Sequence, residues 1–353
     1  IPYPISETLR QQGRARLNWV AAVQVPRDQT PPRSDWNREV DRALFSQRYD
    51  SWRFPWLDIP DIIRRAPAVY EFPMVDRDPL PLLVLRPEDF SLDEARAFMR
   101  EVKTQIDEDL GFAIVDRLPV ERWSLAATRA IWWLLASLVA RPVAQKWDGT
   151  SIYDVTDLGR PPGNGVRPDV TNYEQNFHTD NSYNNEPPHY VGLLCVRTAM
   201  EGGVSGIVSF ATAHEEMRRR HPELLDRLYK PFYFDRQREH APDDVMTTHH
   251  PMFERHGGKL IARLSRFQVT NGHKLAGVPL DNEGVSALEA FEAILNEPGI
   301  AARFDFEPGQ MQLIDNRALG HKRTGFKDWP EAERKRLLVR LWLRDTGSRA
   351  YNG

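Results

Sequence analysis

The tripeptide His178-Thr179-Asp180 contains an imidazole and a carboxylate two residues apart. On an extended segment, side chains at this spacing project to the same face. A second histidine, His321, lies far downstream, at the end of the phrase Ile314 to His321. Two imidazoles and one carboxylate can occupy one face of an octahedral metal and leave positions open for reactants, as in non-haem Fe(II) oxygenases. The three residues therefore predict a metal site, although two hydrogen-bonded histidines at a sheet edge would explain the same pattern.

The composition is that of an ordinary globular protein, with 41% hydrophobic and 27% charged residues in 353. The net charge of −3 gives no electrostatic reason to expect nucleic acid or an anionic membrane as a partner. The longest apolar run, at residues 131–140, is too short to span a bilayer, and the first residues lack the pattern of a signal peptide. Cys195 is the only cysteine, which excludes an intramolecular disulfide and fits a reducing cytoplasm. We therefore expect a cytoplasmic protein that binds neither nucleic acid nor a membrane, and leave open whether it forms a homo-oligomer.

The chain changes character at about residue 85. Residues 1–85 are rich in Pro, Arg and Trp with little sustained periodicity, and we expect an irregular N-terminal extension packed on the core. Residues 86–353 carry regular patterns and the motifs described here, so we expect them to form a single catalytic domain.

From about residue 151 onward the chain is expected to consist mainly of short strands and turns. Helices are expected near residues 91–107, 121–139, 212–228 and 286–296. Strands are expected at residues 111–116, 190–197, 207–210, 232–234, 259–263, 267–269, 302–306, 310–314 and 337–344. Many short strands with a few helices outside them favour a mainly β protein with flanking helices and a double-sheet jelly-roll core. Such a core encloses a cavity between its sheets, where a metal could be held.

The segments around the proposed triad resemble a known family. The similar segments are Phe177 to Tyr183, Pro187-Pro188, Gly202-Gly203 and Asp315 to His321. They are similar to the taurine dioxygenase and clavaminate synthase superfamily of Fe(II)/2-oxoglutarate oxygenases, and the likeness extends over roughly residues 90 to 345. It implies a double-stranded β-helix, which agrees with the jelly roll expected from the strands.

The resemblance implies that His178, Asp180 and His321 bind Fe(II), with 2-oxoglutarate and O2 as co-substrates. The expected reaction oxidises an unactivated C–H bond of a small molecule, by hydroxylation, and releases succinate and CO2. Desaturation or ring formation by the same chemistry is an alternative. A zinc hydrolase or a catalytically silent binding protein could also use this fold. The carboxylate of Asp180 argues against a halogenating variant, since similar halogenases have a small residue at that position.

A 2-oxoglutarate enzyme must hold the carboxylate that does not reach the metal, and the planar fork of arginine suits this task. Strand parity places Arg336, Arg340 and Arg344 on one face, so charge alone does not rank them. In similar enzymes an arginine downstream of the distal histidine binds this carboxylate. The spacing favours Arg336, with Arg340 as the alternative or as a group near the co-substrate or an anionic substrate. Ser205 occupies the position where similar enzymes place a threonine hydroxyl against the same carboxylate.

Five polar residues flank the proposed metal site and are candidates for contact with substrate, although a structural role would explain each as well. They are Tyr173, Gln175, Asn176, Asn181 and His189.

Four further histidines gather in residues 240–256 together with two aspartates. Their spacing fits no zinc-binding pattern, so we expect a mobile polar loop there in preference to a second metal site. In the family that this chain resembles, such a loop commonly lies over the mouth of the active site.

Overall fold

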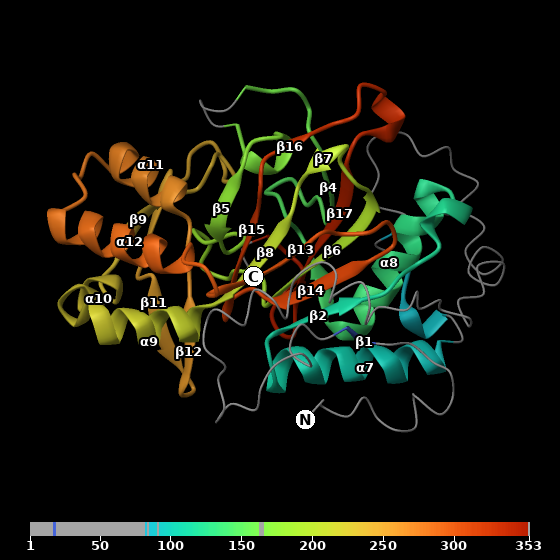
Figure 1. The fold of residues 1–353 in the computed structure, drawn as a ribbon, viewed down its shortest axis with the longest axis horizontal. Coiled ribbons are helices and arrows are strands. Elements are labelled where there is room, and N and C mark those ends of the chain that lie inside the picture. The colour runs from blue at the N-terminus through green and yellow to red at the C-terminus, as the bar shows by residue number, and fades with distance from the viewer. Residues whose placement is uncertain (1–16, 19–81, 83–84, 90–91, 162–165, 352–353) are drawn as a thin grey trace.

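Figure 1 shows the computed structural model of the chain, which describes residues 17–18, 82, 85–89, 92–161 and 166–351. The extension expected for residues 1–85 lies almost wholly outside the described residues. Its packing and the boundary at residue 86 therefore stay predictions.

Two antiparallel sheets form the core and confirm the mainly β jelly roll expected from the sequence. The larger sheet has the order β1-β2-β14-β6-β17-β3, and β4 also pairs with β17. Its strands are β1 (Leu17–Asn18), β2 (Phe112–Val115), β14 (Met311–Asp315), β6 (Tyr190–Arg197), β17 (Leu337–Arg344), β3 (Arg141–Val143) and β4 (Ile152–Val155). The smaller sheet has the order β13-β8-β15-β5. Its strands are β13 (Ala301–Phe304), β8 (Ser205–Ser209), β15 (Leu319–Arg323) and β5 (Gln175–His178). A third, two-stranded pair joins β7 (Glu201–Gly202) to β16 (Phe326–Lys327).

Strand β17 lies in the middle of the larger sheet and is buried on both faces. Leu338 and Trp342 face the core between the sheets, whereas Val339 and Leu341 face the helices outside. The strand expected at residues 337–344 is therefore confirmed, and its side chains alternate between the two faces of the sheet. Arg336, Arg340 and Arg344 have the parity of the inner face, and all three are buried.

Helices α7 (Asp93–Glu108) and α8 (Leu125–Val139) cover the outer face of the larger sheet. The helix expected at 121–139 begins at residue 125, because the Ser124 side chain caps it by accepting from the Ala127 backbone N–H. Trp132 fixes α8 to the sheet by donating its indole N–H to the carbonyl of Val339 at 3.1 Å. Among the described residues, no helix is both long and apolar enough to cross a bilayer.

A mixed unit is inserted between β8 and β13, and Figure 1 shows it to one side of the sheets. It contains α9 (Phe210–Arg220), α10 (Pro222–Leu228), β9 (Phe232–Asp235), β10 (Thr247–His250), β11 (Phe253–His256), β12 (Lys259–Ala262), α11 (Arg266–Ala276) and α12 (Asn282–Leu295). The single helix expected at 212–228 is divided in two. Pro222 cannot donate a backbone hydrogen bond, so the first helix ends at residue 220 and the proline starts the second.

The strand expected at residues 267–269 is wrong, because these residues lie in α11. The Ser265 side chain caps this helix by accepting from the Gln268 N–H, and Gly277 ends it in the left-handed region at φ 66°. Three residues in apolar-polar-apolar order fit a strand, but so short a run also fits one turn of an amphipathic helix.

Candidate metal centre

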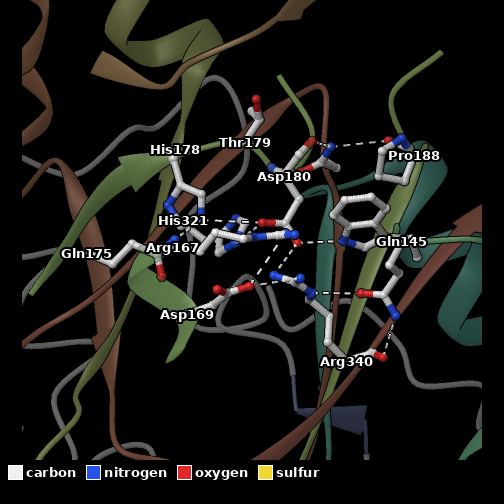
Figure 2. Close-up of polar contacts among 12 residues, drawn as sticks. Gln145, Arg167, Asp169, Gln175, His178, Thr179, Asp180, Pro188, His321 and Arg340 are labelled. Atoms are coloured by element: carbon white, nitrogen blue, oxygen red, sulfur yellow. Dashed lines mark hydrogen bonds and ion pairs between the residues drawn. The ribbon is translucent and has the colours of Figure 1, made fainter. Parts of the chain in front are cut away.

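The three proposed ligands come together at one edge of the smaller sheet. His178 ends β5, and His321 lies opposite it on the neighbouring strand β15. Asp180 lies in the turn after β5, where Asn181 takes a positive φ of 58°. The Oδ1 atom of Asp180 is 3.4 Å from His178 Nε2 and 3.6 Å from His321 Nε2 (Figure 2). One ligand atom from each residue fits within 4.8 Å of the others, so the set can hold one metal ion.

Backbone and amide contacts fix the two upstream ligands. The ring Nδ1 of His178 lies 2.9 Å from the carbonyl of Asn176, which makes Nδ1 the protonated nitrogen and leaves Nε2 as the ligand atom. The Asn316 side chain accepts from the Asp180 N–H at 2.8 Å and donates to the Asp180 carbonyl at 2.9 Å. The asparagine of the downstream Asp315-Asn316-Arg317 segment therefore holds the turn that carries the carboxylate.

The protonation states around Asp180 suit a metal. Burial opposes ionisation, but the Arg340 guanidinium and the contacts with the two histidine rings hold the pKa of Asp180 well below its usual range. Burial, with His178 alongside, lowers the pKa of His321 to about 4. The site therefore presents an ionised carboxylate and a neutral His321 imidazole, as a divalent metal requires. The Gln175 amide contacts His178 Nε2 at 2.8 Å and would have to turn away when a metal binds.

The second oxygen of Asp180 is held by the larger sheet. Trp342 donates its indole N–H to Asp180 Oδ2 at 2.6 Å, and Arg340 lies 3.2 Å from the same oxygen. Both partners have the inner parity of β17. These contacts direct Oδ1 toward the histidines and favour a carboxylate that would bind the metal through one oxygen.

We expect Trp342→Phe to weaken Fe(II) binding by about 10- to 100-fold, because the ring is kept but the hydrogen bond that orients Asp180 is lost. Anaerobic titration of the metal-free protein with Fe(II) measures this. Trp133→Phe is the matched control, since its indole N–H donates to the Leu85 carbonyl outside the site. Equal affinities for the Trp342→Phe variant and the wild type would contradict the orienting role.

Arg340 is fully engaged by the protein. Its Nε donates to Gln145 at 2.8 Å, and its Nη2 donates to Asp169 Oδ2 at 3.1 Å. Together with the contact to Asp180, this places all three nitrogens of the guanidinium against protein acceptors (Figure 2). Sequence reasoning did not identify Asp169 or Gln145, because neither belongs to a motif.

Arg336, in contrast to Arg340, has a guanidinium nitrogen without a protein acceptor. It lines a small cavity of about 40 Å³ beside His178 and His321, together with Ser205. Its Nη1 is buried without a hydrogen-bond partner. Burial lowers the pKa of Arg336 more than the nearby Cys195 and Asp328 raise it.

A larger cavity of about 250 Å³ opens on the other side of the triad. Gln175, Asn176 and Asn181 line it, as do Asp169 and Arg266. Asp169 also borders the small cavity, so it lies where the two cavities meet.

The two remaining substrate candidates do not line these cavities. The Tyr173 side chain is 54% exposed. His189 accepts at Nδ1 from the backbone N–H of Asp345 at 3.2 Å and lies 3.7 Å from the Asp345 carboxylate.

The histidine-rich segment is only partly a loop. His240 lies in the connection between β9 and β10, whereas His249, His250 and His256 lie on strands. The expectation of a loop is therefore wrong for the later three. Among the described residues, the triad is the only group of histidines, cysteines and acids with metal-binding geometry.

His250 is expected to make the chain less stable in mild acid. Burial, with Arg263 nearby, lowers its pKa to about 4 from an unfolded value near 6.5. As the pH falls through this interval, the unfolded state binds a proton that the folded state does not. The contribution of His250 to stability is therefore complete above about pH 6.5 and declines toward pH 4. Urea unfolding is measured in EDTA at pH 7 and pH 5. The free energy of unfolding should fall less between these two pH values in His250→Gln than in wild type. The exposed His256→Gln is the control, and equal losses in all three proteins would contradict the expectation.

The chain was compared with known proteins. The family model described as "Taurine catabolism dioxygenase TauD, TfdA family" matches residues 76–342. FR-33289 synthase of Streptomyces rubellomurinus is 26% identical over 266 residues, which cover 74% of this chain and 76% of that protein.

Among solved structures, asparagine oxygenase with Fe(II), hydroxyasparagine and succinate has a TM-score of 0.63 at 16% identity, covering 83% of this chain and 93% of that one. The non-heme iron oxygenase OrfP with Fe and alpha-ketoglutaric acid has a TM-score of 0.59 at 15% identity, covering 84% and 95%. OrfP was also solved with succinate and (3S)-hydroxy-L-Arg. These likenesses show a shared fold.

Proposed function

The chain belongs to the TauD, TfdA family of dioxygenases, and from this membership we propose that His178, Asp180 and His321 bind its catalytic Fe(II). The enzyme is an Fe(II)/2-oxoglutarate-dependent dioxygenase that hydroxylates a small molecule. The single observation that carries the assignment of ligands is the convergence of two imidazole nitrogens and one carboxylate oxygen within 4.8 Å.

In this proposal Arg336 holds the far carboxylate of 2-oxoglutarate, with the Ser205 hydroxyl beside it. Both residues line the small cavity next to the two histidines, and Arg336 has a buried nitrogen free to donate. Arg340 instead supports Asp180, because its nitrogens are occupied by protein acceptors. A zinc hydrolase would have no need of an unpaired arginine at this position.

Each group at the site has a defined task. The Asn176 carbonyl keeps His178 in the tautomer that offers Nε2, and Trp342 keeps Asp180 Oδ1 toward the metal. Bound Fe(II) supplies the activation of O2 that couples decarboxylation of 2-oxoglutarate to oxidation of the substrate. The protein contributes binding, orientation and a largely enclosed site. Because Asp180 occupies its ligand position, hydroxylation or desaturation is expected and halogenation is not.

The substrate is expected to enter the larger cavity and to be a polar molecule of about amino-acid size. The cavity of about 250 Å³ combines the acid Asp169 with the amides of Gln175, Asn176 and Asn181. Hydroxylated amino acids are bound in asparagine oxygenase and in OrfP, which share the fold. Tyr173 and His189 are weaker candidates, because they do not line the cavity.

The cellular setting is also part of the proposal. Cys195 is the only cysteine and is buried, which is consistent with the cytoplasm. The single catalytic domain over residues 86–353 and the oligomeric state stay predictions.

The central test is anaerobic addition of Fe(II) and 2-oxoglutarate to the purified protein. We expect a weak visible charge-transfer band that is absent in His178→Ala, because the variant lacks one of the two imidazole ligands. His256→Ala, an exposed histidine on β11, should keep the band. No band in wild type, or an undiminished band in His178→Ala, would sink the assignment.

A further inference from the structure

A second buried arginine, Arg323, borders the same small cavity as Arg336. Their side chains are among the least exposed charged groups, at 6% and 4% for the whole residues. Both guanidiniums lie against the Phe326 ring, with their central carbons 4.7 and 5.2 Å from its centroid. Among the described residues, no ion pair involves either guanidinium, and Asp328, the acid beside Arg336, accepts from its backbone N–H at 2.7 Å.

Two like charges buried side by side are unfavourable without an anion between or beside them. Both guanidiniums have buried N–H groups that lack hydrogen-bond partners. Nη1 of Arg336 and both Nε and Nη1 of Arg323 are buried without a hydrogen-bond partner. Most buried polar groups in proteins are hydrogen-bonded, so three such donors at one cavity indicate a ligand with acceptor oxygens.

The position of Arg323 on its strand points it at this cavity. It lies two residues after His321 on β15 and therefore shares its face. Across the ladder its Cα partner is Ser205, whose hydroxyl we have placed beside the far carboxylate of 2-oxoglutarate. Arg336 approaches from the start of β17 in the other sheet, past Gly203, where an added Cβ would lie 3.2 Å from its Nε. The two arginines thus reach the cavity from opposite sheets.

We propose that Arg323 is a second anchor for the far carboxylate of 2-oxoglutarate, which lies between the guanidiniums of Arg323 and Arg336. This inference rests on the proposed function. Arg323 is already held by its Nη2, which donates to the carbonyls of Thr171 and Tyr173. That tether orients the remaining N–H groups before the carboxylate arrives, so little side-chain freedom is lost on binding.

The chemical consequence is selection for a dicarboxylate. A 2-oxoacid without the far carboxylate, such as pyruvate, can chelate the metal but leaves both guanidiniums without an anion. 2-Oxoglutarate supplies charge-assisted hydrogen bonds to both. Loss of either arginine should therefore penalise 2-oxoglutarate and leave pyruvate almost unaffected.

The test measures dissociation constants of Fe(II)-loaded protein for 2-oxoglutarate and for pyruvate, anaerobically, from the charge-transfer band and by calorimetry. We expect Arg323→Gln to raise the 2-oxoglutarate dissociation constant by about tenfold or more and to change the pyruvate constant by less than about twofold. In the Arg336→Gln background the effect of Arg323→Gln should differ from its effect alone, because the two groups share one carboxylate. Arg303→Gln, an exposed arginine on β13, is the matched control and should match wild type.

A purely structural role for Arg323, as a tether for the Thr171 and Tyr173 carbonyls, predicts a different result. Binding of the two 2-oxoacids would then weaken equally or not at all, and the proposal would be overturned. If Arg323→Gln does not fold, Arg323→Lys keeps a charge but loses the fork. The dissociation constant for 2-oxoglutarate must then rise more than the one for pyruvate, so that the ratio of pyruvate to 2-oxoglutarate dissociation constants falls below that of wild type. An unchanged ratio overturns the proposal. If wild type itself gives no band, the proposed function fails. If Arg336→Gln weakens 2-oxoglutarate binding and Arg323→Gln does not, the proposed function stands and only the role of Arg323 is wrong.

Discussion

Asp180→Asn is expected to lower the affinity for Fe(II) by at least about a hundredfold, at the upper end of what loss of a supporting contact costs. The substitution keeps the shape of the side chain but removes the only charged ligand of the triad. The remaining imidazoles then have no anionic partner on the metal. Iron binding is measured by anaerobic titration of the metal-free protein, and O2-dependent formation of succinate from 2-oxoglutarate should fall in parallel.

Asp116→Asn is the control for this substitution. Asp116 is buried to a similar degree and accepts a hydrogen bond from Gln310 at 3.2 Å, but it does not line either cavity. Asp116→Asn should bind Fe(II) with wild-type affinity, even if the substitution lowers the stability of the protein. Asp180→Asn with wild-type iron affinity would show that this carboxylate is not a ligand.

Arg336→Gln is expected to raise the 2-oxoglutarate concentration needed for half-maximal succinate formation by about a hundredfold, while Fe(II) affinity changes little. Arg336 is buried, has an unpartnered Nη1 and lines the cavity beside both histidines. Gln keeps a donor but not the charge or the fork. The dependence of succinate formation on 2-oxoglutarate, set beside an Fe(II) titration, separates the two effects.

Arg340→Gln provides the comparison, because Arg340 lies four residues after Arg336 with the same strand parity and is similarly buried. Its guanidinium contacts Asp180 and Asp169, so its loss should weaken Fe(II) binding more than 2-oxoglutarate binding. If Arg340→Gln raises the 2-oxoglutarate requirement and Arg336→Gln does not, the anchor has been assigned to the wrong arginine.

Much of the fold follows from local patterns along the chain. The sequence predicts a strand at residues 337–344 with Arg336, Arg340 and Arg344 on one face, and in the structure all three have the parity of the inner face. Helix α8 and strands β2, β6 and β14 of the larger sheet were also expected from the sequence, whereas β5 and β15, which carry the two histidines, were not among the expected strands. The residues in α11 were misassigned, because a run of three residues does not distinguish a strand from a helical turn.

The proposed ligands of the candidate site could be predicted from the sequence, but most of the residues that orient them could not. The signal for Arg323 was present, since it lies two residues after His321 and so has the same strand parity. Asp169, Gln145 and Asn176 carry no such signal. They act through contacts with residues that lie elsewhere in the chain or through the backbone carbonyl, which any residue possesses.

The sequence by itself determined the class of fold and the three residues that we propose as metal ligands. A histidine and an acid two residues apart on an extended segment face the same way wherever the strand lies, and short alternating strands must bury their apolar faces against a second layer, a sheet or helices. Only the tertiary structure separates the two arginines that were candidates for the proposed co-substrate site. Arg336 and Arg340 have the same charge and parity, but Arg340 meets Asp169, Asp180 and Gln145, whereas Arg336 meets an aromatic ring and a cavity. The availability of a buried charge depends on partners brought from distant parts of the chain, and these are fixed only when the two sheets pack together.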